Sequence, residues 1–530
     1  MSNNSDFQIE DGVLIRYTGK DKDVVIPDGV TRIGAKAFFS CRSLTSITIP
    51  DSVTGIGGHA FRGCTSLTSI TIPDSVTIIG ENAFEDCTNL TNITIPDSVT
   101  IIGEDAFRGC ESLTSITIPD SVTSIGKNAF AFCENLTSII IPDGVTSIGR
   151  SMFYSCVSLT NITIPDSVTS IGGTAFAYCI GLTNIIIPDS VTSIGRGAFG
   201  GCTNLTNITI PNSVTWIGNY VFHMCESLTS VVIPDGVTSI GRSMFYSCVS
   251  LTNITIPDSV TSIGDSAFED CTNLTNITIP DSVTSIGDSA FGGCTNLTNI
   301  TIPDSVVKIE DGAFSYCTSL TSITIPNNVT SIGCDAFYGC KSLTSITIPN
   351  RVTSIGKFAF CKCESLTSIT IPDSVTSIGE RAFEDCTSLT SIKIAASNEK
   401  YLIINNYDKV ERAIVAATEV FRTRKLDSEV KIPLDLKIQL AVKLVDWYDS
   451  ADAKAYVKKM LTKGVKSLID SGNLELIQVL LEKTDLITKK NVDKYIQYAI
   501  DTKQQEIYLT LIHYKDEIGA YTEISKKFRL

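Results

Sequence analysis

A phrase of 23 residues recurs from Pro27 to Pro372 in this sequence. It reads Ile-Pro-Asp-Ser-Val-Thr-Ser-Ile-Gly-x-x-Ala-Phe-x-x-Cys-x-x-Leu-Thr-x-Ile-Thr, and 16 of the 17 prolines and 16 of the 18 cysteines keep its register. A fixed period of this length is typical of a solenoid, in which each unit buries its apolar face only against its neighbours. About the first 395 residues are therefore expected to form one stack of coils.

Each repeat carries the signals of one strand and one return segment. In the copy at residues 69–72, Ser-Ile-Thr-Ile alternates polar and apolar side chains, which indicates a strand with one buried face. Pro73 cannot donate to a strand ladder, so it is expected to end the strand and open a turn. Val76 and Ile79 are expected to return to the core, and residues 81–84 to form a short helical or 3₁₀ return segment.

Cysteine and aspartate each form a column along the stack. The cysteines from Cys41 to Cys386 are interpreted as buried reduced thiols, because a free cysteine behaves as a small, readily buried hydrophobe. The aspartates from Asp28 to Asp373 could form a cation-binding ladder or could cap the turn after proline. Turn capping is favoured, because asparagine keeps the capping hydrogen bond and loses the charge. Asparagine replaces aspartate in three repeats, at Asn212, Asn327 and Asn350.

The full pattern, Cys-x-x-Leu-x-x-Ile-x-Ile-Pro-x-x-Val-x-x-Ile-Gly-x-x-Ala-Phe, resembles the BspA-like (Treponema pallidum-type) leucine-rich-repeat family over roughly residues 7–395. The resemblance implies a leucine-rich-repeat solenoid, an α/β fold with one parallel strand per coil. It also implies an extracellular or surface-associated protein of the adhesin or surface-antigen kind, and it implies no catalytic residue. Residues 141–172 are identical to residues 233–264, which indicates duplication of a block of repeats.

The outward strand positions are the candidate binding residues. They form rows of hydroxyl and amide groups that could meet a protein or a glycan. The alternative is that threonine stands there only for its high strand propensity and its stacking in a ladder. In four early repeats these positions are Ser46, Thr48, Ser69, Thr71, Asn92, Thr94, Ser115 and Thr117.

Variation between repeats concentrates beside the Ala-Phe pair. Exposed aromatic residues there are either contact points or neutral changes on a surface. Examples are Phe132, Tyr154, Tyr178, His223, Tyr316 and Tyr338.

No cofactor, metal or catalytic site is expected. Cys334 and Cys361 break the cysteine register, but they lack Cys-x-x-Cys spacing and a nearby histidine, so zinc is disfavoured. The three histidines, His59, His223 and His513, are far apart, and no nucleophile elbow or phosphate-binding loop occurs. The sequence therefore predicts a non-enzymatic protein.

Three domains are expected: an N-terminal cap hairpin at 1–25, the solenoid at 26–406, and an all-α region at 407–530. Helices are predicted near 408–424, 434–448, 451–470, 473–483, 490–501, 504–515 and 520–528. Residues 465–483 and 496–514 align at an offset of 31, and the first of them resembles the helical part of an ankyrin repeat. Two readings of this region stay open: a cap on the last coil, or a second protein-docking module.

Charge and hydropathy limit the classes of partner that the chain is expected to bind. Residues 1–390 carry a net charge of −19 and residues 391–530 a net charge of +4. An acidic solenoid repels phosphate backbones and anionic lipid, so neither nucleic acid nor a membrane surface is an expected partner. No apolar run approaches the roughly 20 residues of a membrane helix, so membrane insertion is not expected, and the oligomeric state is left open. No secretory signal is recognised, which favours the cytoplasm, whereas the family resemblance favours the cell surface.

Overall fold

The computed structural model describes residues 6–397, 400–405, 411–426 and 432–521. The chain divides into two compact units: Met1–Pro326 with Ala336–Ser342, and Asn327–Asp335 with Leu343–Leu530. The first unit, called unit 1, is built only of solenoid coils and the N-terminal hairpin. The second, called unit 2, contains the last coils and, among its described residues, six helices.

One coil of unit 1 contains two short strands, β7 (Ser69–Thr71) and β8 (Ile78–Ile79). Ile70 is 4% exposed and Ile72 is 2% exposed, while Ser69 and Thr71 face outward, as the alternation predicts. The second strand was not predicted, since two residues are too short to show a period of two. Val76 and Ile79 lie fully buried on the far side of the proline turn.

Both strands pair in parallel with their counterparts one repeat away, as Ser69 with Asn92 and Ile78 with Ile101. The first ladder of unit 1 consists of β3 (Asp23–Val25), β5 (Ser46–Thr48), β7, β9 (Asn92–Thr94), β12 (Ser138–Ile140), β14 (Asn161–Thr163), β16 (Asn184–Ile186), β18 (Asn207–Thr209), β20 (Ser230–Val232), β22 (Asn253–Thr255), β24 (Asn276–Thr278) and β26 (Asn299–Thr301).

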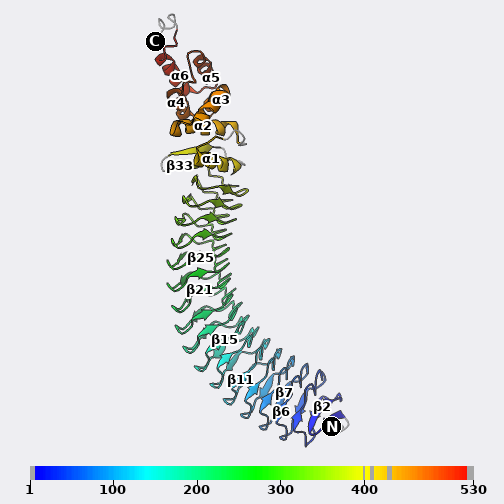
Figure 1. Cartoon of the computed structure of the whole chain (residues 1–530). Helices are drawn as coiled ribbons and strands as arrows, with labels where there is room; N and C mark the ends of the chain where they lie inside the picture. Colours follow the sequence, from blue (N-terminus) through cyan, green and yellow to red (C-terminus); the bar gives the residue numbers. More distant parts are fainter. Residues whose placement is uncertain (1–5, 398–399, 406–410, 427–431, 522–530) are drawn as a thin grey trace. The chain divides into compact units, whose positions relative to one another are not determined.

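The second ladder of unit 1 consists of β4 (Arg32–Ile33), β6 (Gly55–Ile56), β8, β10 (Ile101–Ile102), β11 (Ser124–Ile125), β13 (Ser147–Ile148), β15 (Ser170–Ile171), β17 (Ser193–Ile194), β19 (Trp216–Ile217), β21 (Ser239–Ile240), β23 (Ser262–Ile263), β25 (Ser285–Ile286) and β27 (Lys308–Ile309). The coils follow one another in sequence order from β2 to β25 (Figure 1).

The core is a set of one-residue columns. Phenylalanine rings stack from coil to coil, with Phe61 and Phe84 at a centroid separation of 5.3 Å and an interplanar angle of 4°. From Cys64 to Cys340, the column cysteines donate their S–H groups to the carbonyl of a phenylalanine in the preceding coil, as Cys64 does to Phe38 at 3.1 Å. All 18 cysteines are free, and every one except the partly exposed Cys41 and Cys334 is buried, so the interpretation as buried thiols is confirmed.

The return segment is a chain of tight turns, without the helical or 3₁₀ stretch expected there. The amide of Glu85 donates to the carbonyl of Asn82 at 3.1 Å, and that of Cys87 to Phe84 at 3.2 Å. These are 3₁₀-type bonds, but Asn82 and Asp86 adopt left-handed backbone angles, with φ of 53° and 59°. A left-handed residue every fourth position stops the turn from propagating into a helix.

Serine, and not aspartate, ties the proline turn to its neighbour. The amide of Val76 donates to the carbonyl of Pro73 at 3.0 Å, and the Ser75 hydroxyl donates to the Val53 carbonyl of the preceding coil at 2.5 Å. Asp74 is exposed, and among the described residues its carboxylate accepts no hydrogen bond. The predicted capping by aspartate is therefore wrong at Asp74, because the Val76 amide of the turn donates to the Pro73 carbonyl and not to the carboxylate.

A hairpin precedes the first coil, inside the range 1–25 predicted for an N-terminal cap. β1 (Phe7–Glu10) and β2 (Val13–Tyr17) are antiparallel and turn at Asp11 and Gly12, whose φ values are 47° and 76°. β2 also pairs in parallel with β4 of the first coil. The hairpin therefore covers the strand edge that the first coil would otherwise expose.

In unit 2 the solenoid strands are β28 (Ser331–Ile332), β29 (Ser345–Thr347), β30 (Ser354–Ile355), β31 (Ser368–Ile371), β32 (Ser377–Ile378) and β33 (Ser391–Ser397). β34 (Lys400–Asn405) pairs with β33 in the antiparallel sense and so ends the parallel ladder. β34 is thus a closing hairpin strand.

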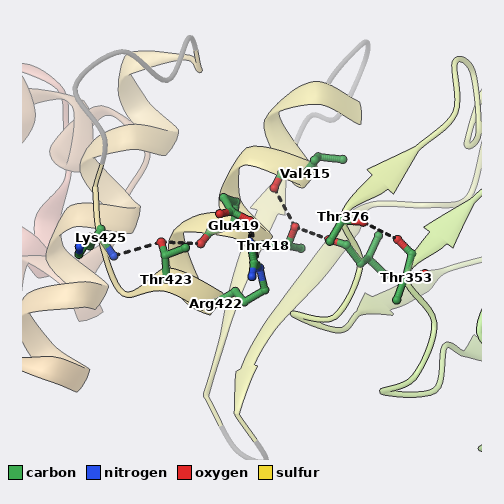
Figure 2. Close-up of polar contacts among 9 residues, drawn as sticks. Thr353, Thr376, Val415, Thr418, Glu419, Arg422, Thr423 and Lys425 are labelled. Carbon is green, nitrogen blue, oxygen red and sulfur yellow. Dashed lines mark hydrogen bonds and ion pairs between the residues drawn. The ribbon is translucent and has the colours of Figure 1, made fainter.

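Helix α1 (Glu411–Thr423) packs on β32 and β33 and caps the last coil. Its buried Thr418 hydroxyl donates to the Val375 carbonyl at 2.8 Å and lies 2.7 Å from the Val415 carbonyl of its own helix (Figure 2). Figure 2 also shows the Thr376 hydroxyl, which donates to the carbonyl of Thr353 one coil earlier at 3.1 Å. The capping interpretation is therefore supported for this first helix.

Five more helices follow, and the predicted ranges agree closely with them. They are α2 (Leu434–Tyr448), α3 (Ala451–Asp470), α4 (Leu474–Lys483), α5 (Val492–Asp501) and α6 (Gln505–Glu517). A seventh helix was predicted near 520–528, where Ala520 and Tyr521 are not helical and the rest lies outside the described residues.

Candidate binding surfaces

The predicted outward residues lie where the strand pattern places them. Ser46, Thr48, Ser69, Thr71, Asn92 and Thr94 belong to β5, β7 and β9, and only Ser46 is less than fully exposed. Ser115 and Thr117 continue the rows through a single bridge between Ser115 and Ser138. The first ladder thus brings all eight onto one face, which is called the strand face below.

Most of these side chains have unused hydrogen-bonding capacity. Ser46 donates to the Asp23 carboxylate at 2.6 Å, a bond that, with a weaker one from Thr45, lowers the pKa of Asp23. Among the described residues, the hydroxyls of Thr71, Thr94 and Thr117 make no hydrogen bond with the protein. They are therefore available to a partner, although strand propensity alone would also place threonine there.

Between Ile140 and Val232, aliphatic side chains interrupt the threonine row in every second coil. Ile140, Ile186 and Val232 are 70%, 82% and 65% exposed at positions equivalent to Thr71. A shallow hollow beside Val232 is lined by β18, β20 and the turn at Asn212. The sequence analysis missed this alternation, although the substitutions at a fixed register position are visible in the sequence.

The return segments bring aromatic residues together on a second surface, called the flank. Phe132 and Tyr154 meet edge to face at 5.3 Å, and Tyr154 and Tyr178 do so at 5.5 Å. The Arg108 guanidinium lies 5.0 Å from the centre of the Phe132 ring. Three of the predicted aromatic positions, Phe132, Tyr154 and Tyr178, therefore form a connected cluster over neighbouring coils.

A buried carboxylate anchors one end of the flank. The Glu85 residue is only 3% exposed and pairs with Arg62 at 3.0 Å and with Arg108 at 3.3 Å. The Asn82 amide also donates to it, at 2.6 Å. Such a charge is stable in the interior only because three donors surround it, and the sequence analysis did not identify it.

No metal or catalytic cluster emerges among the described residues. No group of three or more histidine, cysteine or carboxylate side chains there has the arrangement of a metal site. His513 pairs with Glu517 at 3.2 Å on α6, far along the chain from His59 and His223 in the coils. Within the described part of the chain, no helix has the length and apolar character needed to cross a bilayer.

The repeats of this chain match the family described as BspA type Leucine rich repeat region. Six overlapping copies cover residues 16–137, 77–206, 123–251, 192–321, 238–362 and 307–407. The chain belongs to this family. No curated protein matched it significantly.

Several solved structures of leucine-rich-repeat proteins are similar to this BspA-type chain. A leucine-rich repeat protein from Bacteroides ovatus is 34% identical, with a TM-score of 0.51, over 66% of this chain and 92% of that one. A leucine rich cell surface protein from Faecalibacterium prausnitzii is 32% identical, with a TM-score of 0.41, over 75% and 93%. The T. pallidum leucine-rich repeat protein is 34% identical, with a TM-score of 0.33, over 39% and 91%.

Proposed function

We propose that this chain is a non-enzymatic recognition protein that binds a protein partner through the strand face and acts in adhesion at a cell surface. The observation that carries the proposal is the row of exposed hydroxyls at Thr71, Thr94 and Thr117, which lack hydrogen bonds within the described protein. The BspA-type repeats support a repeat-based protein-interaction role. Ile140, Ile186 and Val232 add the apolar contacts from which interfaces gain most of their affinity.

A second candidate is a scaffold inside the cell that joins partners through the solenoid and an ankyrin-like tail. It is favoured by a repeated helix–turn–helix unit, α3–α4 and α5–α6, in which Gly472 and Lys503 take left-handed φ values of 64° and 60°. The Asn473 amide donates to the Leu468 carbonyl at 2.9 Å, and Gln504 donates to Ala499 at the same distance. Both turns lie 31 residues apart, the offset expected from the sequence.

Binding by the strand face can be tested with the purified full chain on beads. Retention is measured on cultured epithelial cells, before and after trypsin has removed their surface proteins. We expect retention by untreated cells only. We also expect T71K/T94K/T117K to abolish it, because three lysines at the centre of an interface add charge that must be desolvated.

A matched variant, T77K/T100K/T123K, places the same charges on exposed threonines beside the second ladder. It should bind as the unchanged chain does. If both triple variants are retained to the same extent, or if retention survives trypsin, the strand face is not the protein-binding surface.

A further inference from the structure

A hollow on the flank collects polar and aromatic groups from three successive coils. Its volume is about 470 Å³, and Asp105, Arg108, Asn128, Phe132, Ser151 and Tyr154 line it. This volume falls within the range of small-molecule sites, which combine apolar walls with a few converging polar groups. The hollow lies on the return segments and is distinct from the strand face.

The polar groups of the hollow are held in place by their neighbours. Arg108 lies 3.3 Å from Glu85 and 3.7 Å from Asp105. Ser151 shares a hydrogen bond of 2.7 Å with Thr174 of the next coil. Partial burial raises the pKa of Asp105, so its carboxylate gains from any further hydrogen-bond donor.

These contacts indicate which class of ligand the hollow can bind. Two carboxylates already balance the Arg108 charge, so an anionic ligand would find no unpaired cation. The Arg108 guanidinium also lies over one face of the Phe132 ring, so a cationic ligand beside that ring would be repelled by the Arg108 charge. A neutral ligand with neighbouring hydroxyls matches the carboxylate, guanidinium and amide, because each of these groups can form paired hydrogen bonds.

We propose that this hollow is a carbohydrate subsite that binds a neutral pyranose. The vicinal hydroxyls of the sugar bond to Asp105, Arg108 and Asn128. Its C–H face packs against the Phe132 and Tyr154 rings, whose negative π faces attract weakly positive C–H groups. The proposal does not depend on protein binding by the strand face.

The backbone supplies a test variant that keeps the fold. Phe132 has a left-handed φ of 60°, and glycine occupies the same repeat position at Gly63 and Gly109, with φ of 73° and 71°. Replacing Phe132 with glycine therefore removes the ring from a position that glycine accepts without strain.

A second aromatic pair in unit 1 supplies the matched control. Tyr316 also has a left-handed φ, of 57°, and meets Tyr338 edge to face at 5.1 Å. The repeat positions equivalent to Asp105, Arg108 and Asn128 are there Ser289, Gly292 and Gly312, which lack the carboxylate, the guanidinium and the amide.

Saturation-transfer NMR on the full chain, with the methyl glycosides of glucose, galactose, mannose and N-acetylglucosamine as probes, tests the subsite. We expect transfer to the ring C–H protons of at least one glycoside, with affinity about tenfold weaker in F132G and unchanged in Y316G. Superimposable far-UV circular dichroism would establish that F132G is folded.

Three results would overturn the subsite: no transfer to any glycoside, transfer that F132G leaves intact, or an equal loss in Y316G. If tetralysine binds the unchanged chain but not F132G, and no glycoside binds, the sugar proposal would also be overturned. The hollow would then be a site for a cationic peptide. Loss of epithelial-cell retention in T71K/T94K/T117K tests the strand face separately, since that variant leaves the flank unchanged.

Discussion

Glu85 shows how a single side chain can depend on the coils on either side of it. Its carboxylate is buried beside Arg62 of the preceding coil and Arg108 of the following coil. The sequence Ala-Phe-Glu-Asp-Cys recurs at Glu269, but that glutamate is half-buried and forms no ion pair among the described residues. The same five residues therefore produce a buried ionic group in one coil and a surface group in another.

We predict that E85Q destabilises unit 1 by about 1–3 kcal/mol, because it removes the charge that two arginines share and leaves them poorly paired. E269Q should change the free energy of unfolding by less than about 0.5 kcal/mol, as a surface substitution does. Urea unfolding of both variants measures the difference. Equal effects would show that the Glu85 ion pairs do not contribute to stability.

The cysteine column makes a prediction about reactivity. Burial raises the pKa of these thiols, to about 12 for Cys202, and the thiolate is the form that reacts. At pH 8 iodoacetamide should modify at most the partly exposed Cys41 and Cys334 in the native chain, and all 18 cysteines in urea. A raised pKa means that folding favours the protonated thiol, so this stabilisation is complete only below the ordinary thiol pKa of about 9 and is lost as the pH rises from there toward the raised value; protection should therefore weaken across that range. Rapid native modification of many column cysteines, counted by mass spectrometry, would show that the coils open.

At the scale of one coil, the repeat unit itself can be deleted. Removing residues 256–278 joins Thr255 to Ile279, which keeps every column in register. Since coils contact only their neighbours, the shortened chain should stay folded and lose only a few degrees of Tm. Removing residues 256–267 instead shifts Phe268 and Cys271 out of their columns.

That 12-residue deletion should lower the Tm by much more than the whole-coil deletion, as measured by circular dichroism. A similar Tm for the two variants would mean that the 23-residue register does not govern packing.

The elements differ in how well the sequence predicts them. The strand at Ser69–Thr71 was predictable because its alternation recurs in coil after coil, and the helices because their apolar period is long. The strand at Ile78–Ile79 was not, because two residues carry no period. The return segments were misread as helical or 3₁₀, since left-handed angles at asparagine and aspartate, such as Asn82 and Asp86, are invisible to pattern reasoning.

The candidate sites show the same limit. The outward rows at Thr71 and Thr94 follow directly from strand periodicity. The flank cluster joins Arg108, Phe132 and Tyr154 from three coils, and only the stacking geometry shows that these residues meet. The sequence identified Phe132 and Tyr154 as variable positions but could not pair them with a particular arginine.

At the scale of the whole molecule, the net charge is −15, and the acidic residues concentrate in residues 1–390. Repulsion among like charges keeps such a surface soluble and disfavours nucleic acid as a partner. A repeated surface of this kind is suited to contact with a large partner, and the proposed role in adhesion requires that surface to be outside the cell.

Protease shaving of intact cells that express the chain tests this requirement most directly, with released peptides identified by mass and a cytoplasmic protein monitored for lysis. The account predicts release of peptides from residues 26–406 while the cytoplasmic marker stays inside. Full protection of those peptides, with release only after lysis, would contradict adhesion and leave the intracellular scaffold as the function of the chain.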